Sequence, residues 1–321
     1  MKTNLCLIFL IFLLLIPINV SAKTTIKVGY LPILDHLTLV VSHERDNEKF
    51  KEVNVELKMF KRWDDMAGAL NAGVIDAGFI LSTVAMDMFN TGSDIKTVLL
   101  AHRNGSAITV KKDSDIHSAT GLKDKKVAIP HRKATHVALL DKYLRKEGLS
   151  LKNVDATVVD PPYMEESMKL GRIDAFIVAE PFGAKAHLHG VGRVLVLTKD
   201  IIDNHVECIV VVRNQFLKQN ISAVQEWVES LIRSGKFIEK DKRETKLNSV
   251  SAIAKKYMGH DEEVVREGLK NPTDRILFDN LNPEISDFQK IADIAVQAGI
   301  IEKVDLEGFI DSRFYKKAKE K

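Results

Sequence analysis

The sequence has little cysteine, little proline and no excess of either charge, and each shortage excludes a class of protein. Two Cys in 321 residues are too few for a disulfide-stapled fold. Eight Pro and 17 Gly exclude a collagen-like chain, and 45% hydrophobic residues exclude a disordered one. Because 47 Lys and Arg are interleaved with 44 Asp and Glu, no basic face for nucleic acid is expected. The length favours a globular protein of two lobes, each with its own core.

The chain also lacks the short motifs of common catalytic chemistry. It contains no G-x-S-x-G, H-E-x-x-H, P-loop or C-x-x-C pattern. His187, His189 and His205 complete no recognisable ligand set with a nearby carboxylate or cysteine, so we expect them at a rim or on the surface. We therefore predict no catalytic residue, no metal site and no cofactor.

The one long apolar run lies at the N-terminus. Lys2 precedes the run Leu5–Ile16, and Val20-Ser21-Ala22 supplies the small residues that signal peptidase reads. The run is about 12 residues, shorter than the roughly 20 of a spanning helix, so an export signal is favoured over a membrane anchor. We predict a signal peptide over residues 1–22 and a periplasmic or otherwise extracytoplasmic protein. Cys208 is then the only thiol of the mature chain, so no internal disulfide is possible.

From residue 25 onward, short β-branched runs alternate with amphipathic stretches. This alternation predicts βαβ units on mainly parallel sheets, which is an α/β fold. After about residue 221 the pattern is almost wholly helical. The predicted strands are 26–31, 53–60, 76–81 and 96–102, then 126–130, 155–160 and 174–180.

A segment of the first half is repeated in the second. Gly73 and Asp76 recur as Gly171 and Asp174 in similar surroundings, each at the junction of a helix with a buried strand. Such junctions are common in any α/β protein, but the shared order around both favours two similar lobes. The strand-like segments 106–110 and 208–213 are placed where the chain passes between lobes. The predicted division is 23–109 plus 210–321 for lobe one and 110–209 for lobe two, with a double-strand hinge beside a ligand cleft.

The chain resembles the extracytoplasmic solute-binding proteins of nitrate, sulfonate, taurine and bicarbonate uptake systems, and their thiamine-precursor relatives. The resemblance covers nearly the whole mature chain. It is carried by fragments in a shared order: Val28–Pro32, Trp63, 75–77, Asn104–Val110, Thr135-His136 and Ile173–Phe182.

The resemblance implies a fold, a function and partners. The fold is a type II periplasmic binding protein with two mainly parallel sheets flanked by helices and a helical C-terminal region. The function is capture of a small polar or anionic solute by a monomer, and its delivery to an ABC permease. An enzyme like those that make the thiamine pyrimidine, or an exported ligand sensor, is the alternative. Nitrate binders tend to carry a Lys where this chain has Cys208, which argues against nitrate.

Ligands of doubly wound sheets bind beyond the carboxyl ends of strands, next to helix N-termini. Segments of this kind hold most of the candidate ligand residues, while Trp63, Ser106 and His136 also follow from the resemblance. A plain helix cap for Ser82 or Thr83, and core packing for the aromatic residues, are the structural alternatives. The candidate ligand-binding residues are Tyr30, His36, Trp63, Ser82, Thr83, Ser106, Thr135, His136, Tyr163 and Glu180.

Overall fold

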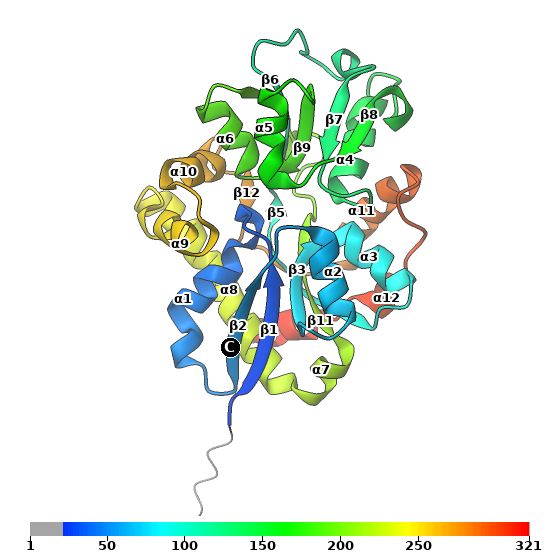
Figure 1. Cartoon of the computed structure of the whole chain (residues 1–321). Helices are drawn as coiled ribbons and strands as arrows, with labels where there is room; N and C mark the ends of the chain where they lie inside the picture. The colour runs from blue at the N-terminus through cyan, green and yellow to red at the C-terminus, as the bar shows by residue number, and fades with distance from the viewer. Residues whose placement is uncertain (1–21, 321) are drawn as a thin grey trace, which may run out of the picture.

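The computed structural model describes residues 22–320, so all but the last residue of the predicted signal peptide lies outside the described residues. Within this range the strands form two five-stranded sheets and one two-stranded pair. The two large sheets lie one above the other with helices around both (Figure 1). No helix of the described part is long and apolar enough to cross a membrane.

The first sheet has the strand order β2-β1-β3-β11-β4. β1, β2 and β3 run parallel, and β11 is antiparallel to both of its neighbours. All five residues of β3 are buried, which is why its sequence is apolar throughout rather than alternating. The strands are β1 (Thr24–Tyr30), β2 (Val53–Met59), β3 (Ala77–Leu81), β4 (Ile95–Leu100) and β11 (Cys208–Arg213). The helices among them are α1 (Leu37–Asp46), α2 (Trp63–Asn71) and α3 (Ser82–Asn90).

The second sheet has the strand order β10-β6-β9-β7-β8. β7 runs parallel to its two neighbours, β8 and β9, whereas β6 is antiparallel to its own neighbours, β9 and β10. Its strands are β6 (Ser106–Lys111), β7 (Lys126–Ile129), β8 (Asp155–Val158), β9 (Ala175–Ala179) and β10 (Gly192–Leu197). The helices that accompany them are α4 (Thr135–Arg145), α5 (Met164–Lys169) and α6 (Phe182–Leu188). These two sheets flanked by helices confirm the predicted α/β class.

The repeated segment makes the same contact in both sheets. Asp76 Oδ2 accepts a hydrogen bond from the backbone N–H of Lys27, and Asp174 Oδ2 accepts one from Lys126, each at 2.9 Å. Gly73 and Gly171 have φ values of 71° and 68°, which glycine adopts at little cost after a helix. Each Asp therefore holds the backbone of the adjacent parallel strand, at the middle of β1 and at the start of β7.

The chain crosses between the sheets slightly earlier than the predicted lobe boundaries. β6 pairs with β9 from Ser106 to Val110, and β11 pairs with β3 from Cys208 to Val212. The predicted boundaries at 109/110 and 209/210 therefore fall inside strands that each belong wholly to one sheet. The first crossing runs through β5 (Arg103–Asn104), and the second lies between β10 and β11.

The C-terminal region is helical, as predicted, apart from the short β12 (Ile276–Leu277), which pairs with β5. α8 packs on α1 and β2, whereas α10 contacts α6 and α11 contacts α4. The region assigned by the sequence to lobe one thus touches helices beside both sheets. Its helices are α7 (Asn214–Gln219), α8 (Ile221–Glu244), α9 (Asn248–Met258), α10 (Glu262–Lys270), α11 (Ile285–Gln297), α12 (Leu306–Phe309) and α13 (Arg313–Lys319).

Candidate functional site

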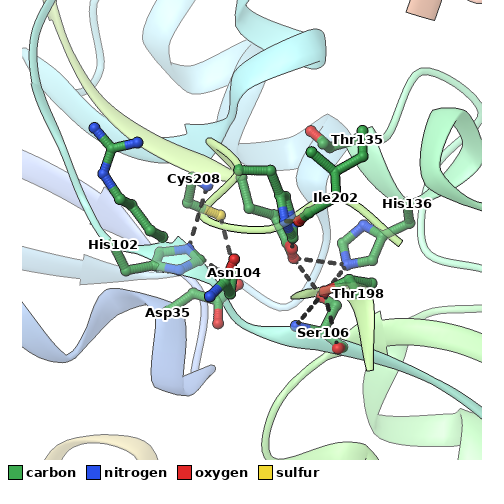
Figure 2. Close-up of polar contacts among 12 residues, drawn as sticks. Asp35, His102, Asn104, Ser106, Thr135, His136, Thr198, Ile202 and Cys208 are labelled. Carbon is green, nitrogen blue, oxygen red and sulfur yellow. Dashed lines mark hydrogen bonds and ion pairs between the residues drawn. The ribbon is translucent and has the colours of Figure 1, made fainter. Parts of the chain in front are cut away.

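A buried polar cluster lies where the carboxyl ends of strands from both sheets meet (Figure 2). Asp35 and His36 follow β1, Ser82 and Thr83 follow β3, and His136 follows β7. The remaining members come from the two crossings and the strand ends beside them. We call this set the cleft cluster, and each member is at most 3% exposed: Asp35, His36, Ser82, Thr83, His102, Asn104, Ser106, Thr135, His136, Thr198, His205, Glu207 and Cys208.

The first turns of α3 and α4 face each other across the cleft. Thr135 Oγ1 lies 3.2 Å from both Ser82 Oγ and Thr83 Oγ1, and Thr83 Oγ1 donates to the carbonyl of Lys133 at 2.5 Å. The predicted helix cap by Ser82 or Thr83 is wrong, because Leu81 is the N-cap of α3 and its side chain makes no capping bond. The hydroxyls are used between the lobes instead.

Charged side chains join the same two faces at the surface. Arg62 Nε lies 3.5 Å from Asp160, and Lys133 Nζ lies 3.2 Å from Asp87. Deeper in the cleft, the N–H of Leu34 donates to the carbonyl of Glu180 at 2.8 Å. The structure therefore has the two lobes closed against each other.

Glu207 is the centre of one half of the cleft cluster. Its Oε1 lies 3.1 Å from His136 Nε2 and accepts a hydrogen bond from Ser106 Oγ, and its Oε2 lies 3.1 Å from His205 Nε2. Burial by itself would raise the pKa of Glu207, but His136 and His205 outweigh it and hold that pKa well below its usual range. His205 Nδ1 faces the carbonyl of Ile202 at 2.8 Å, so both ring nitrogens of His205 lie next to oxygen atoms.

Asp35, His102 and Cys208 form the other half. His102 Nε2 lies 3.2 Å from Asp35 Oδ2, and Cys208 Sγ lies 3.8 Å from the same oxygen. Burial raises the pKa of Asp35 to about 7 despite the adjacent His102. Burial also raises the pKa of the Cys208 thiol well above its usual value, and Asp35 adds to this effect. One ligand atom from each residue lies within 4.8 Å of the other two.

Several buried polar atoms of this region have no hydrogen-bond partner among the described residues. They are Asp35 Oδ1, His36 Nε2, Trp63 Nε1, His102 Nδ1 and His136 Nδ1. Buried polar atoms in native proteins are nearly always paired with protein, water or ligand. Several of the unpaired buried atoms of the described residues therefore lie around this cleft.

The structure brings most of the predicted site residues together. Ser82, Thr83, Ser106, Thr135 and His136 all belong to the cleft cluster and contact one another or Glu207. His36 also belongs to it, and its ring lies 5.8 Å from that of Trp63 in an edge-on arrangement.

Three predicted residues lie apart from the cleft cluster. Tyr163 is 61% exposed, and Tyr30 Oη donates to the carbonyl of Tyr257 at the end of α9. Glu180 is buried, but its carboxylate accepts hydrogen bonds from Arg275 and from the N–H of Ala184. Strand-end position alone did not reveal that the C-terminal helical region reaches Tyr30 and Glu180.

The sequence interpretation did not place Asp35, His102, Asn104, Thr198, Glu207 or Cys208 among the candidate ligand residues. It also expected His205 at a rim or on the surface, whereas His205 is buried and lies 3.1 Å from Glu207. His102 follows β4 closely, so the same strand-end rule would have found it. Glu207 precedes an antiparallel strand, where that rule gives no signal. The absence of a metal site was predicted from local spacing, whereas residues 35, 102 and 208 meet only in the folded chain.

Comparisons with known proteins agree with this architecture. The model of the NMT1-like family matches residues 20–254. The nitrate/nitrite binding protein NrtA of Nostoc sp. (strain PCC 7120) is 24% identical over 252 residues, which are 69% of this chain and 57% of that protein. A putative aliphatic sulfonates-binding protein of Escherichia coli K12 is 27% identical over 177 residues, 54% of this chain and 55% of that protein. The matched part thus spans little more than half the length of these curated relatives.

Solved structures match more completely. The ligand-binding component of an ABC-type import system from Staphylococcus aureus, with zinc bound, has a TM-score of 0.84 and 26% identity, covering 92% of this chain and 99% of that one. The periplasmic nitrate-binding protein NrtA from Synechocystis PCC 6803 has a TM-score of 0.82 at 18% identity, covering 93% and 89%. The desulfurization enzyme DSZB shares the fold at a TM-score of 0.67 and 13% identity, covering 93% and 99%.

Proposed function

Because the chain belongs to the NMT1-like family and has the fold of type II periplasmic binding proteins, we propose that it is the solute-binding component of an ABC-type import system. In this proposal residues 1–22 direct export, and the mature protein is an extracytoplasmic monomer. It captures a small solute between its lobes and delivers it to a membrane permease.

The closed cleft is the observation that carries the proposal. Polar side chains from both lobes meet there without solvent exposure, and Thr135 of α4 contacts Ser82 and Thr83 of α3. A solute in this place touches both lobes only when they are together, so it binds the closed state better and shifts the population toward it. Closure coupled to binding is what a transport component needs, since the permease can then tell loaded from empty protein.

The charges of the cleft favour a particular class of solute. Asp35 and Glu207 are both buried there, whereas the two buried arginines nearby are already engaged. Arg103 Nη2 lies 2.8 Å from Asp287, and Arg275 pairs with Glu180. A fixed anion such as nitrate or a sulfonate would meet two carboxyl groups and no free guanidinium. The site is better matched to a solute that carries positive charge or hydrogen-bond donors.

The Ser-His-Glu contacts do not have the geometry of a nucleophilic triad. In such a triad the carboxylate holds His Nδ1 while the Ser hydroxyl faces Nε2. Here Ser106 and Glu207 both contact His136 Nε2, and His136 Nδ1 has no partner. The Ser-His-Glu contacts therefore do not support nucleophilic catalysis, and we propose binding rather than the alternative of an enzyme. An exported sensor would use the same binding chemistry and differ in its docking target.

Small-angle scattering and thermal unfolding of the mature protein test this proposal. A panel of anions, sulfonates, thiamine precursors and divalent cations is screened, and native mass spectrometry of protein from its own host identifies any retained molecule. We expect at least one solute to compact the ligand-stripped protein and to raise its Tm. Glu207→Gln should weaken both responses, and the solute should be recovered unchanged. The proposal is contradicted if neither a solute of the panel nor the retained molecule compacts the protein, or if the solute is chemically converted.

A further inference from the structure

We infer that Asp35, His102 and Cys208 bind a divalent transition-metal ion of the zinc class, and that this ion is a component of the solute captured in the cleft. The second half of this inference rests on the proposed function, while the first half stands on the geometry of the three side chains. Each side chain is fully buried, and one donor atom from each lies within 4.8 Å of the other two.

The donor set selects the class of metal. An imidazole nitrogen, a thiol sulfur and a carboxylate oxygen are the three ligand types that Zn²⁺ takes in proteins. Ca²⁺ and Mg²⁺ prefer sites made of oxygen atoms alone, so Cys208 and His102 argue against them. Soft and borderline ions such as zinc favour the thiolate and imidazole.

The distances suit a tetrahedral ion. With metal bonds of roughly 2.0 Å to nitrogen and oxygen and 2.3 Å to sulfur, the nitrogen-to-oxygen separation is about 3.3 Å and the sulfur-to-oxygen separation about 3.5 Å. The structure has 3.2 Å between His102 Nε2 and Asp35 Oδ2, and 3.8 Å between Cys208 Sγ and Asp35 Oδ2. Shifts of a few tenths of an ångström would bring these two pairs to the separations expected around an ion, and the third pair, His102 and Cys208, lies within 4.8 Å.

Metal binding at the three atoms would replace only weak contacts. The N–H of Cys208 donates to His102 Nε2 at 3.2 Å, and the Cys208 thiol faces Asp35 Oδ2 at 3.8 Å, so an ion would exchange both contacts for bonds to itself. Among the described residues, Asp35 Oδ1 and His102 Nδ1 have no hydrogen-bond partner although both are buried.

Gly105 allows the two side chains to approach. A Cβ at this position would lie 2.8 Å from Asp35 Oδ1 and 3.0 Å from His102 Nδ1, closer than real Cβ contacts. The φ of Gly105 is +114°, a conformation that other residues rarely adopt. The backbone at the crossing is thus shaped so that Asp35 and His102 pack directly against it.

The position of the site explains how an ion would be captured and covered. The three donors lie after β1, after β4 and at the start of β11, all strands of the first sheet. The ion can therefore bind one lobe before the other closes over it. Three protein donors leave the fourth tetrahedral position open, which suits an ion that must enter and leave.

Cobalt spectroscopy tests the metal site directly. The mature protein is treated with a chelator and titrated with Co²⁺, and the near-ultraviolet thiolate-to-cobalt charge-transfer band is followed. We expect one equivalent to produce the band and Zn²⁺ to abolish it by displacement. Cys208→Ser should remove the band, and His102→Gln should weaken Zn²⁺ binding by about 100-fold or more, since even second-shell changes cost roughly 10–100-fold.

Two controls separate the site from folding and from adventitious binding. Urea unfolding of Cys208→Ser shows whether the variant folds, and His189→Gln removes a histidine that faces Glu165 at the surface. The His189 variant should bind Co²⁺ like the wild type. Binding without the charge-transfer band, or a band that persists in Cys208→Ser, overturns the metal site.

Scattering with Zn²⁺ separates this inference from the proposed function. Compaction by Zn²⁺, lost in Cys208→Ser, supports both. A different solute that compacts the protein without any metal overturns the cargo half of the inference and leaves the proposed function standing. A cobalt band with no compaction by any solute, alone or with Zn²⁺, overturns the proposed function and the cargo role, and leaves only the metal site.

Discussion

At the scale of the residue, the cleft cluster contains ionisable groups that a core optimised for stability would not hold. Asp35, His36, His102, His136 and Glu207 are each 0% exposed. Burial of a charge costs several kcal/mol unless partners compensate it, and replacing buried ion pairs by apolar residues is often neutral or stabilising. Strongly shifted pKa values in a cleft, such as those of Asp35 and Glu207, are typical of functional sites. These residues are therefore better explained by ligand binding than by stability.

Gly105→Ala should destabilise the protein, because the new Cβ meets Asp35 and His102 at 3.0 Å or less in a backbone conformation unsuited to alanine. We expect a loss of about 3 kcal/mol, combining roughly 1–2 for a left-handed residue with roughly 1–3 for overpacking. The free energy of unfolding is measured by urea denaturation monitored by circular dichroism.

Gly148→Ala is the matched control. Gly148 also has a positive φ, of +71°, but no atom lies within 4 Å of its Cβ position. Only the backbone cost of about 1 kcal/mol is expected there. Equal losses in the two variants would contradict the close packing at Gly105.

The sequence predicted those site residues whose position follows from a local rule. Ser82, Thr83, Thr135 and His136 were found because each comes just after a parallel strand. Glu207 and Cys208 were not assigned to the site, because β11 is antiparallel and enters the first sheet from a distant part of the chain. Only the folded topology shows that its start lies beside the other strand ends.

At the scale of the element, α1 and α8 are joined by a partly buried polar contact. Asp46 Oδ2 accepts hydrogen bonds from Ser230 Oγ at 2.7 Å and from Arg233 Nη2 at 3.0 Å, and Ser42 Oγ lies 2.7 Å from Ser230 Oγ. Partial burial by itself would raise the pKa of Asp46, but the bonds from Ser230 and Arg233 outweigh it and the pKa lies below its usual value. The ionised carboxylate therefore stabilises the packing of α8 on the first lobe.

Asp46→Asn should lower stability at neutral pH and matter less in acid. Because the folded pKa is lower than the unfolded pKa of about 3.9, the contribution of Asp46 is complete above about pH 5 and is lost as pH falls through the folded pKa. We expect the difference in unfolding free energy between wild type and variant to shrink steadily below about pH 4.

Urea unfolding at a series of pH values measures this difference. Asp113→Asn, in an exposed turn, reports the effect of removing one carboxylate from the surface. A difference for Asp46→Asn that stays constant down to the lowest pH at which both proteins fold would show that its charge is not what joins α1 to α8.

The sequence predicted the individual strands and helices more successfully than it predicted which sheet each strand joins. The strand and helix segments follow from the period of the apolar residues, and the repeat of Gly73 and Asp76 at Gly171 and Asp174 marks a real structural repeat. The predicted lobe boundaries fall inside β6 and β11, because both strands are buried along nearly their whole length. The sequence of such a strand does not indicate which of the two sheets the strand joins.

At the scale of the whole molecule, Thr135 is one of the residues through which the two lobes meet. Its hydroxyl lies within hydrogen-bond distance of Ser82 and of Thr83, so one side chain joins the first turns of α3 and α4. Both contacts exist only in the closed form. A change here alters the balance between open and closed protein more than the stability of either lobe.

Thr135→Val should therefore weaken solute binding while the protein remains folded. Two neutral hydrogen bonds are worth about 1–2 kcal/mol together, so the Kd of the solute that compacts the protein should rise about 5- to 30-fold. Scattering of the solute-free variant should report a larger mean radius of gyration than that of the wild type, because a greater share of molecules is open. Thr120→Val, at an exposed turn of the second lobe, is the matched control and should change neither quantity. A Kd that is unchanged in Thr135→Val would mean that the hydroxyl contacts between α3 and α4 follow closure without stabilising it, and closure would then depend on the solute and the buried charges alone.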